Sequence, residues 1–281
     1  MTEKYQGSYQ HAVQFKEKLD INAIFRSAYK HVKERRSPFV GSVAWTAVIL
    51  FAALILVAAL VRVLGIEADG SVQAILNTSV QVLILAPCVG GLTYVALKTT
   101  LLDKPNREDF FQFFSNPWSI IGVSILTAIV SNVGFLLPHM IAIPWLIAAH
   151  ILFTLAVPMA AIYRAKPFAA FIGSIQLVTK HFGTFFMLHF VMFVLYLLVG
   201  FGAVILSNFA QAGQVGMFVG VAGGVVLAYI IFTRLVPLQF FAIAEIYRIL
   251  FNVTSEKSEM SDDSQPPTEE TDESTSEDFR P

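Results

Sequence analysis

Charged residues and cysteine are both scarce in this sequence. Only 14% of the 281 residues are charged and 56% are hydrophobic, whereas a soluble domain has roughly 45–50% apolar residues. The single cysteine, Cys88, excludes a disulfide framework and a thiolate metal cluster within one chain. These shortages argue against a soluble domain and favour a protein whose solvent is largely lipid.

Signatures of catalysis are also missing. The sequence contains no phosphate-binding glycine loop followed by Lys and Ser or Thr, no nucleophile elbow and no zinc-protease helix. No polar segment is long enough to form a catalytic domain. The basic residues lie at the ends of apolar stretches and not in a nucleic-acid-binding patch. We therefore expect no enzymatic activity, no cofactor, no metal and no nucleic-acid partner.

Six apolar stretches dominate the chain. Crossing about 30 Å of hydrocarbon takes about 20 helical residues, and these stretches approach or exceed that length. They comprise residues 43–64, 73–97, 120–137, 141–163, 185–206 and 215–232. The sequence thus predicts an all-α integral membrane protein in which residues 43–252 form a six-helix transmembrane bundle.

Three shorter segments carry apolar residues on one helical face. Residues 20–36, 107–114 and 168–182 each precede a pair of apolar stretches, which suggests three repeats of an amphipathic helix followed by a helical hairpin. Such helices are expected at the membrane interface, with their cations near anionic lipid head groups. The alternative for the first of them is an ordinary surface helix that packs on protein.

The distribution of Lys and Arg predicts the topology. If the N-terminus is cytoplasmic, 17 of the 19 Lys and Arg lie in cytoplasmic segments, and Arg62 is alone on the far side. This one-sidedness places both termini in the cytoplasm. We expect residues 1–42 to be a cytoplasmic segment that contains the first amphipathic helix. Residues 253–281 carry 10 acidic side chains and no apolar periodicity, so we expect a disordered acidic tail.

Glycines recur in the last apolar stretch. Gly216, Gly220 and Gly224 lie four residues apart, so they leave one helix face without side chains and allow another helix to approach closely. The alternative is the generally higher glycine content of membrane helices. We expect these glycines to form a helix-packing face.

Polar side chains inside apolar stretches are the candidates for a solute path. Ser124, Thr127 and Ser131 form one helical stripe, although such residues also bond to their own backbone or to a neighbouring helix. His150 and His189 are candidates for proton relay. Each is a single histidine on an otherwise apolar face, which is also typical of a structural residue.

Three charged residues share one face of a helix that we expect to run beyond the last stretch. Arg234, Glu245 and Arg248 are separated by nearly whole numbers of turns. We expect Glu245 to pair with Arg248 at i, i+3 near the inner interface. Such a pair would explain these charges without a functional role.

Three segments carry a resemblance to a known group. They are DINAIFRSAYKHVKERRSPFV before the first stretch, residues 157–186 (VPMAAIYRAKPFAAFIGSIQLVTKHFGTFF) and the closing AIAEIYRILF. The chain resembles a group of uncharacterised bacterial inner-membrane proteins related to the membrane domain of some glycerophosphodiester phosphodiesterases. The resemblance implies a six-span protein of the bacterial inner membrane. The phosphodiesterase catalytic domain is absent, and the turn LPHMIAIP and the acidic tail depart from the group.

Two functions remain open from the sequence. The first is a non-enzymatic membrane protein that serves membrane organisation, envelope homeostasis or the assembly of a membrane-protein partner, with anionic lipids at its cytoplasmic face. The alternative is a small-solute or lipid transporter that uses the polar stripe together with His150 and His189. A water-filled or lipid-open space beside Ser124, Thr127 and Ser131 would favour transport, and tight packing there would favour the first function.

Overall fold

The protein is all-helical throughout the part that the structure describes. The computed structural model describes residues 7–63, 78–211 and 213–253, with isolated residues between 64 and 77. Most of the expected acidic tail and the first residues of the second stretch lie outside these ranges. The helices are α1 (Tyr9–Gln14), α2 (Ile21–Arg35), α3 (Ser37–Val63), η2 (Gln81–Leu85), α5 (Ala86–Thr100), α6 (Arg107–Ser115), α7 (Trp118–Val133), η3 (Gly134–Leu136), α8 (His139–Leu152), α9 (Ala156–Ala161), α10 (Pro167–Lys180), α11 (Phe182–Ala210), α12 (Gln214–Ile230), η4 (Ile231–Leu235) and α13 (Val236–Phe251).

Five of the described helical segments are long and apolar enough to cross a membrane. They are Ser37–Val63, Thr78–Thr100, His139–Ala161, Phe182–Ala210 and Gln214–Phe251. The pair α6 and α7 makes a sixth candidate, bent by 74° between its two helices. This confirms the prediction of an all-α protein with several helices of membrane-spanning length. The last segment continues beyond the apolar stretch of residues 215–232 as far as Phe251, because α12, η4 and α13 follow one another without a break.

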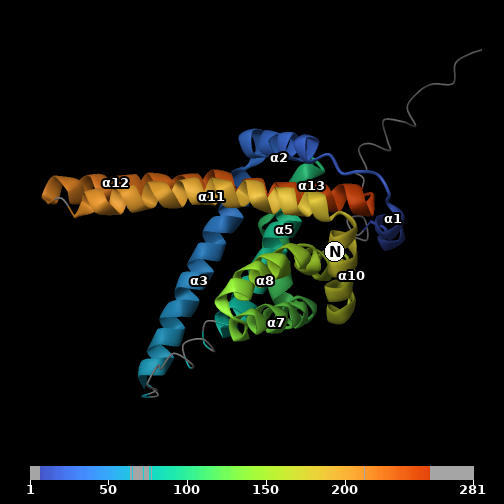
Figure 1. The fold of residues 1–281 in the computed structure, drawn as a ribbon, viewed down its shortest axis with the longest axis horizontal. Helices are drawn as coiled ribbons and strands as arrows, with labels where there is room; N and C mark the ends of the chain where they lie inside the picture. The colour runs from blue at the N-terminus through green and yellow to red at the C-terminus, as the bar shows by residue number, and fades with distance from the viewer. Residues whose placement is uncertain are drawn as a thin grey trace, which may run out of the picture.

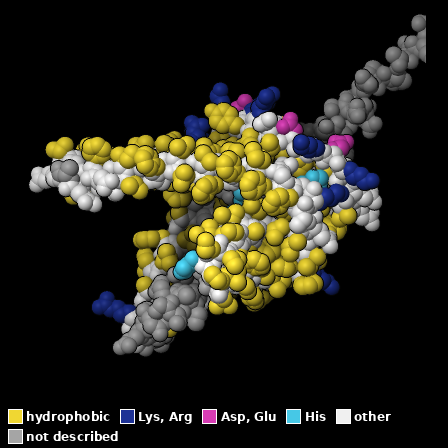
Figure 2. All heavy atoms as spheres, viewed as in Figure 1, with side chains coloured by type: hydrophobic (Ala, Val, Ile, Leu, Met, Phe, Trp, Pro, Cys, Tyr) yellow, Lys and Arg dark blue, Asp and Glu magenta, His cyan; other side chains and the backbone are white. Residues whose placement is uncertain are grey.

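The described helices do not assemble into a compact six-helix bundle. Figure 1 shows α11 and α12 leaving the body side by side as one arm, while α3 leaves it in another direction. In the most apolar 18 residues of each helix, only 6% are buried in α11 and 11% in α3. These helices are apolar on every side, which suits a lipid environment and does not require one packed face. Figure 2 shows hydrophobic side chains along much of the visible surface of the arm.

The buried core is formed largely by the shorter helices around α5 and α13. Asp20 caps α2 by accepting a hydrogen bond from the Asn22 backbone N–H at 2.9 Å. Ile24, Ala28 and Val32 of α2 are then buried, and α2 packs mainly on α13. The expectation that the apolar face of α2 enters the lipid interface is therefore wrong. The alternative, a helix packed on protein, is what the structure shows.

The other two amphipathic helices also pack on protein. Helix α6 packs on α5, and α10 packs on α7 and α9. Helix α10 does so through residues such as Leu177 and Val178, whereas Phe168 at its start stays 67% exposed. Phe110 and Phe113 of α6 are buried, and the Phe110 carbonyl oxygen lies 2.6 Å from where a Cβ on Gly91 would be. Burial of an apolar face against a complementary protein surface removes as much water as insertion into lipid does. Sequence periodicity alone cannot separate these two environments.

The arm is held together by close approach of α12 to α11. A Cβ at Gly220 would lie 2.5 Å from the Ala210 Cβ, and a Cβ at Gly223 would lie 2.5 Å from a methyl carbon of Leu206. Gly216 is half-buried. Gly224 has nothing within 4 Å of its Cβ position, so it lies outside the packing face that the sequence predicted for it. Because an α-helix has 3.6 residues per turn, residues that face the same neighbour are spaced alternately three and four apart. The residue that follows Gly220 on the packing face is therefore Gly223.

Candidate functional site

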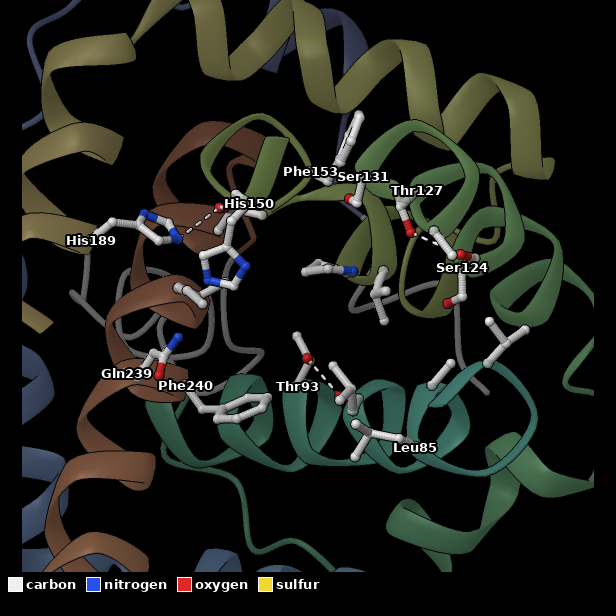
Figure 3. A pocket seen from close by; sticks show the side chains of 18 of the residues that line it. Leu85, Thr93, Ser124, Thr127, Ser131, His150, Phe153, His189, Gln239 and Phe240 are labelled. Carbon is white, nitrogen blue, oxygen red and sulfur yellow. Dashed lines mark hydrogen bonds between the residues drawn. The ribbon is translucent and has the colours of Figure 1, made fainter. Parts of the chain in front are cut away.

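A cavity of about 540 Å³ lies between α5, α7, the junction of α8 and α9, α11 and α13 (Figure 3). The structure brings all five residues of the predicted solute path to its wall. Volumes of roughly 300–1,000 Å³ are typical of sites for small molecules. The predicted residues that line it are Ser124, Thr127, Ser131, His150 and His189.

Helix α7 supplies the hydroxyl groups of one wall. Ser124, Thr127 and Ser131 lie on one helical face, as their spacing predicts, and this face borders the cavity. The Thr127 hydroxyl donates to the Ser124 carbonyl oxygen at 3.0 Å. Within the described residues the hydroxyls of Ser124 and Ser131 make no hydrogen bond. Each of these two hydroxyls can therefore donate to and accept from a bound molecule.

A break between α8 and α9 shapes the opposite wall. The buried Ser174 hydroxyl of α10 donates to the Leu152 carbonyl oxygen at 2.7 Å and accepts from the Leu155 N–H at 3.2 Å. It thereby satisfies backbone groups that the interrupted helix leaves without partners. The break places Phe153 and Thr154 in the cavity lining.

His150 and His189 meet at this wall, although they belong to different helices. Their rings lie with centroids 5.0 Å apart and planes at 88°. Figure 3 shows both rings at the same end of the cavity. The Thr154 hydroxyl is hydrogen-bonded to His189. The sequence could treat them only as two single histidines, because nothing local relates residues 39 positions apart.

The hydrogen bonds of His189 assign its tautomer. Its Nδ1 lies 2.8 Å from the Phe185 carbonyl oxygen, which can only accept, so Nδ1 carries the hydrogen. The neutral ring then accepts at Nε2 from the Thr154 hydroxyl at 3.1 Å. If Nε2 takes up a proton it donates to Thr154 instead, and the threonine hydroxyl turns to the Ile151 carbonyl oxygen at 2.7 Å. Both protonation states of His189 therefore find partners.

Sequence reasoning missed three polar groups of the lining, namely Thr93, Thr154 and Gln239. Thr93 donates to the Val89 carbonyl oxygen at 2.7 Å, and the Tyr196 hydroxyl donates to Gln239 Oε1 at 3.1 Å. Gln239 is a polar residue within an apolar helix, so the cost of burying its amide was a signal available in the sequence. Thr93 and Thr154 gave no comparable signal.

The composition of the lining restricts what the cavity can hold. None of its described lining residues is Asp, Glu, Lys or Arg, and the polar groups are hydroxyls, amides and imidazoles among apolar side chains. A bare ion would lose its hydration without a compensating charge. The described residues hold no group of three or more His, Cys, Asp or Glu that could bind a metal. The cavity therefore suits a neutral molecule with both polar and apolar parts.

A second polar cluster fastens α2 to α13. The buried carboxylate of Glu245 accepts from the Ser27 hydroxyl at 2.5 Å and from Arg248 Nε at 2.7 Å. His31 Nε2 lies 3.4 Å from the same carboxylate. The predicted pairing of Glu245 with Arg248 is confirmed, whereas Ser27 and His31 could be found only from the tertiary structure. This cluster has a structural role, because it joins two helices and borders no described cavity.

Comparisons with known proteins found no matching family model, no matching curated protein and no matching solved structure. The resemblance to the bacterial inner-membrane group stays a prediction.

Proposed function

We propose that this protein is a membrane transporter or carrier for a small neutral solute or lipid-like molecule, which binds in the cavity lined by α7, α8 and α11. One observation supports this above all: five polar residues of three apolar helices converge on one open cavity. A pure packing role would leave these side chains in contact with a neighbouring helix. The non-enzymatic character of the protein is part of the same proposal.

The bound molecule would be recognised by hydrogen bonds to the polar side chains of the lining and by contact with its apolar side chains. Ser124 and Ser131 offer hydroxyls without partners among the described residues. Val89, Phe153 and Phe240 contribute apolar surface. This combination fits a molecule that carries hydroxyl or amide groups beside a hydrocarbon part. Proton uptake at His189 reverses the bond to Thr154, which gives the site a means of coupling to a proton.

The proposal includes a membrane arrangement. Six spans, with α6 and α7 together as the third, cross the bacterial inner membrane, and both termini are cytoplasmic. The distribution of Lys and Arg supports this orientation, and five or six helices of sufficient length support the number of spans. The resemblance to bacterial inner-membrane proteins points to the same location.

A second candidate function follows from the arm. Both helices of the arm expose apolar side chains along their lengths, including Phe201, Phe209, Val215 and Phe218. Such a surface suits membrane organisation or contact with a membrane-protein partner. The cavity plays no part in that function, so the two proposals can be separated by experiment.

The test is to identify small molecules that remain bound after mild detergent extraction, by native mass spectrometry of the intact protein. Ser131→Phe places a ring in the cavity, and Ile129→Phe makes the same kind of change at a residue of α7 that is 58% exposed and outside the lining. We expect one molecule bound to wild type and to Ile129→Phe, and about tenfold less in Ser131→Phe. Equal retention in the two variants, or an empty wild type, would contradict the cavity proposal.

A further inference from the structure

A second cavity, of about 560 Å³, lies where the apolar helix α11 begins. One wall is the segment of residues 16–21 between α1 and α2, and the other runs from residue 180 to residue 187. The Thr184 hydroxyl of α11 donates to the Leu19 carbonyl oxygen at 3.3 Å. Lys180 Nζ also donates to the Val13 carbonyl oxygen. The first bond joins the two walls, and the second joins Lys180 to helix α1.

The polar lining of this second cavity is predominantly basic. Lys16, Lys18 and Lys180 line it together with His181, and Glu17 is the one acidic residue among its described lining residues. Lys16 and Lys18 are exposed, so their ammonium groups remain hydrated and mobile. His181 Nε2 is buried and has no hydrogen-bond partner within the described residues.

The apolar lining continues along α11 in the direction of the hydrocarbon. Phe182 and Met187 line the cavity and are 46% and 43% exposed. Phe186 stacks on Phe182 with ring centroids 5.9 Å apart, and Phe190 follows at 6.2 Å. A row of exposed rings thus leads away from the lysines along a helix of membrane-spanning length.

From this juxtaposition we propose that the cavity binds the phosphate-bearing head group of an anionic phospholipid, whose acyl chain lies along Phe182, Phe186 and Phe190. The lysines sit at the start of a membrane span, where head groups lie. Charge alone would suit free phosphate equally, but the exposed phenylalanine row has no role in binding an inorganic ion. The inference rests on the proposed membrane arrangement. It is independent of the first cavity, lined by α7, α8 and α11, which is called the solute cavity below.

The experiment compares two double variants that remove the same number of charges. Lys16→Gln/Lys18→Gln neutralises the cavity, and Arg26→Gln/Lys30→Gln neutralises exposed residues of α2 that do not line it. Native mass spectrometry of the full chain in detergent counts bound phosphatidylglycerol against phosphatidylcholine of the same chain length. A third arm adds inorganic phosphate as a competitor.

We expect wild type and Arg26→Gln/Lys30→Gln to retain one phosphatidylglycerol in preference to phosphatidylcholine, and Lys16→Gln/Lys18→Gln to lose about tenfold in retention. Inorganic phosphate in millimolar excess should not displace the lipid. Equal retention in both double variants, equal loss in both, or displacement by phosphate would each overturn the proposal. None of these results depends on whether the solute cavity is occupied, so a failure here leaves the proposed function standing.

Discussion

Single buried polar residues decide which helices of this protein stay in contact. Glu245 is 3% exposed and accepts hydrogen bonds from Ser27 on α2 and from Arg248 on its own helix. Removing the carboxylate leaves these donors without their acceptor, and His31 loses its neighbour. A buried charge is tolerated only while its partners are present, so the whole cluster acts together.

We expect Glu245→Ala to lower the free energy of unfolding by about 2–3 kcal/mol, because the partner groups left behind lose charge-assisted hydrogen bonds. The measurement is denaturant unfolding of the full chain in detergent. Arg248→Ala is the companion variant, and it should cost less because the Arg248 side chain is 40% exposed. A loss below about 1 kcal/mol in Glu245→Ala would show that the cluster is not important for stability.

His181 should give the protein a dependence of stability on pH. Burial, aided by the charge of Lys180, lowers the pKa of this histidine below its usual value of 6.5. The unfolded chain therefore takes up a proton at a higher pH than the folded chain does. The contribution of His181 to stability is complete above the usual pKa, and it is lost as the pH falls below it.

The expected result is a smaller fall in Tm between pH 7.5 and pH 5.5 for His181→Asn than for wild type. Thermal unfolding in one detergent at matched ionic strength measures it. His139→Asn, an exposed residue at the start of α8, serves as the control and should follow wild type. A wild-type fall in Tm that is unchanged in His181→Asn would refute the linkage.

At the residue scale, the sequence predicted which polar side chains of α7 share a helical face. It did not predict which residues of other helices line the same cavity. Ser124, Thr127 and Ser131 share a face because helical spacing is a local property. The meeting of His150 with His189 depends on the break between α8 and α9, and Ser174 on a third helix stabilises that break. A contact that requires three segments to be placed correctly has no local signature.

At the scale of elements, the packing of α11 against α12 offers the sharpest test. Gly220 faces Ala210 and the Leu206 carbonyl oxygen, whereas Gly224 faces open space. The same substitution at these two positions therefore has different consequences. Both residues belong to one helix and lie about one turn apart, which keeps helix propensity equal in the comparison.

We expect Gly220→Leu to separate the two helices of the arm, with a cost of about 1–3 kcal/mol from overpacking. Gly224→Leu should leave the pair intact. Hydrogen exchange in detergent, read by mass spectrometry on peptides of α12, should show faster exchange in the first variant only. Equal protection in both variants would contradict the observed packing face.

For the amphipathic helices, the sequence predicted where each helix lies in the chain but not what its apolar face contacts. The N-cap Asp20 and the end of α2 at Arg35, just before Ser37-Pro38, follow from local capping and proline chemistry. Whether the apolar face of α2 meets lipid or α13 is decided by the shape of α13. That helix begins at Val236, directly after the π-helical turn η4, and its packing surface is not visible in the sequence of α2.

At the scale of the whole molecule, composition indicated membrane-spanning helices but not their arrangement. Stretches such as α3 and α11 are apolar on all sides, so no face identifies a neighbour. Their divergence from the core leaves an open recess between the arm and the rest of the body, which Figure 2 shows.

Topology is the prediction that belongs to the whole chain. With both termini cytoplasmic, reporter domains fused to either end should be active on the cytoplasmic side and protected from protease added to the other side. A reporter inserted after Arg62 should behave in the opposite way. Termini found on opposite faces would require an odd number of spans and would contradict the proposed arrangement.

The central claim is that the cavity beside α7 is an accessible polar site within the membrane-spanning part of the molecule. The chain has one cysteine, the buried Cys88, so Cys88→Ala provides a background in which Ser131→Cys and Ile129→Cys each introduce the only thiol. Thiols react as thiolates, which requires polar surroundings. We predict that a small water-soluble thiol reagent labels Ser131→Cys about tenfold faster than Ile129→Cys in native membranes. Equal, slow labelling of both would contradict the cavity account.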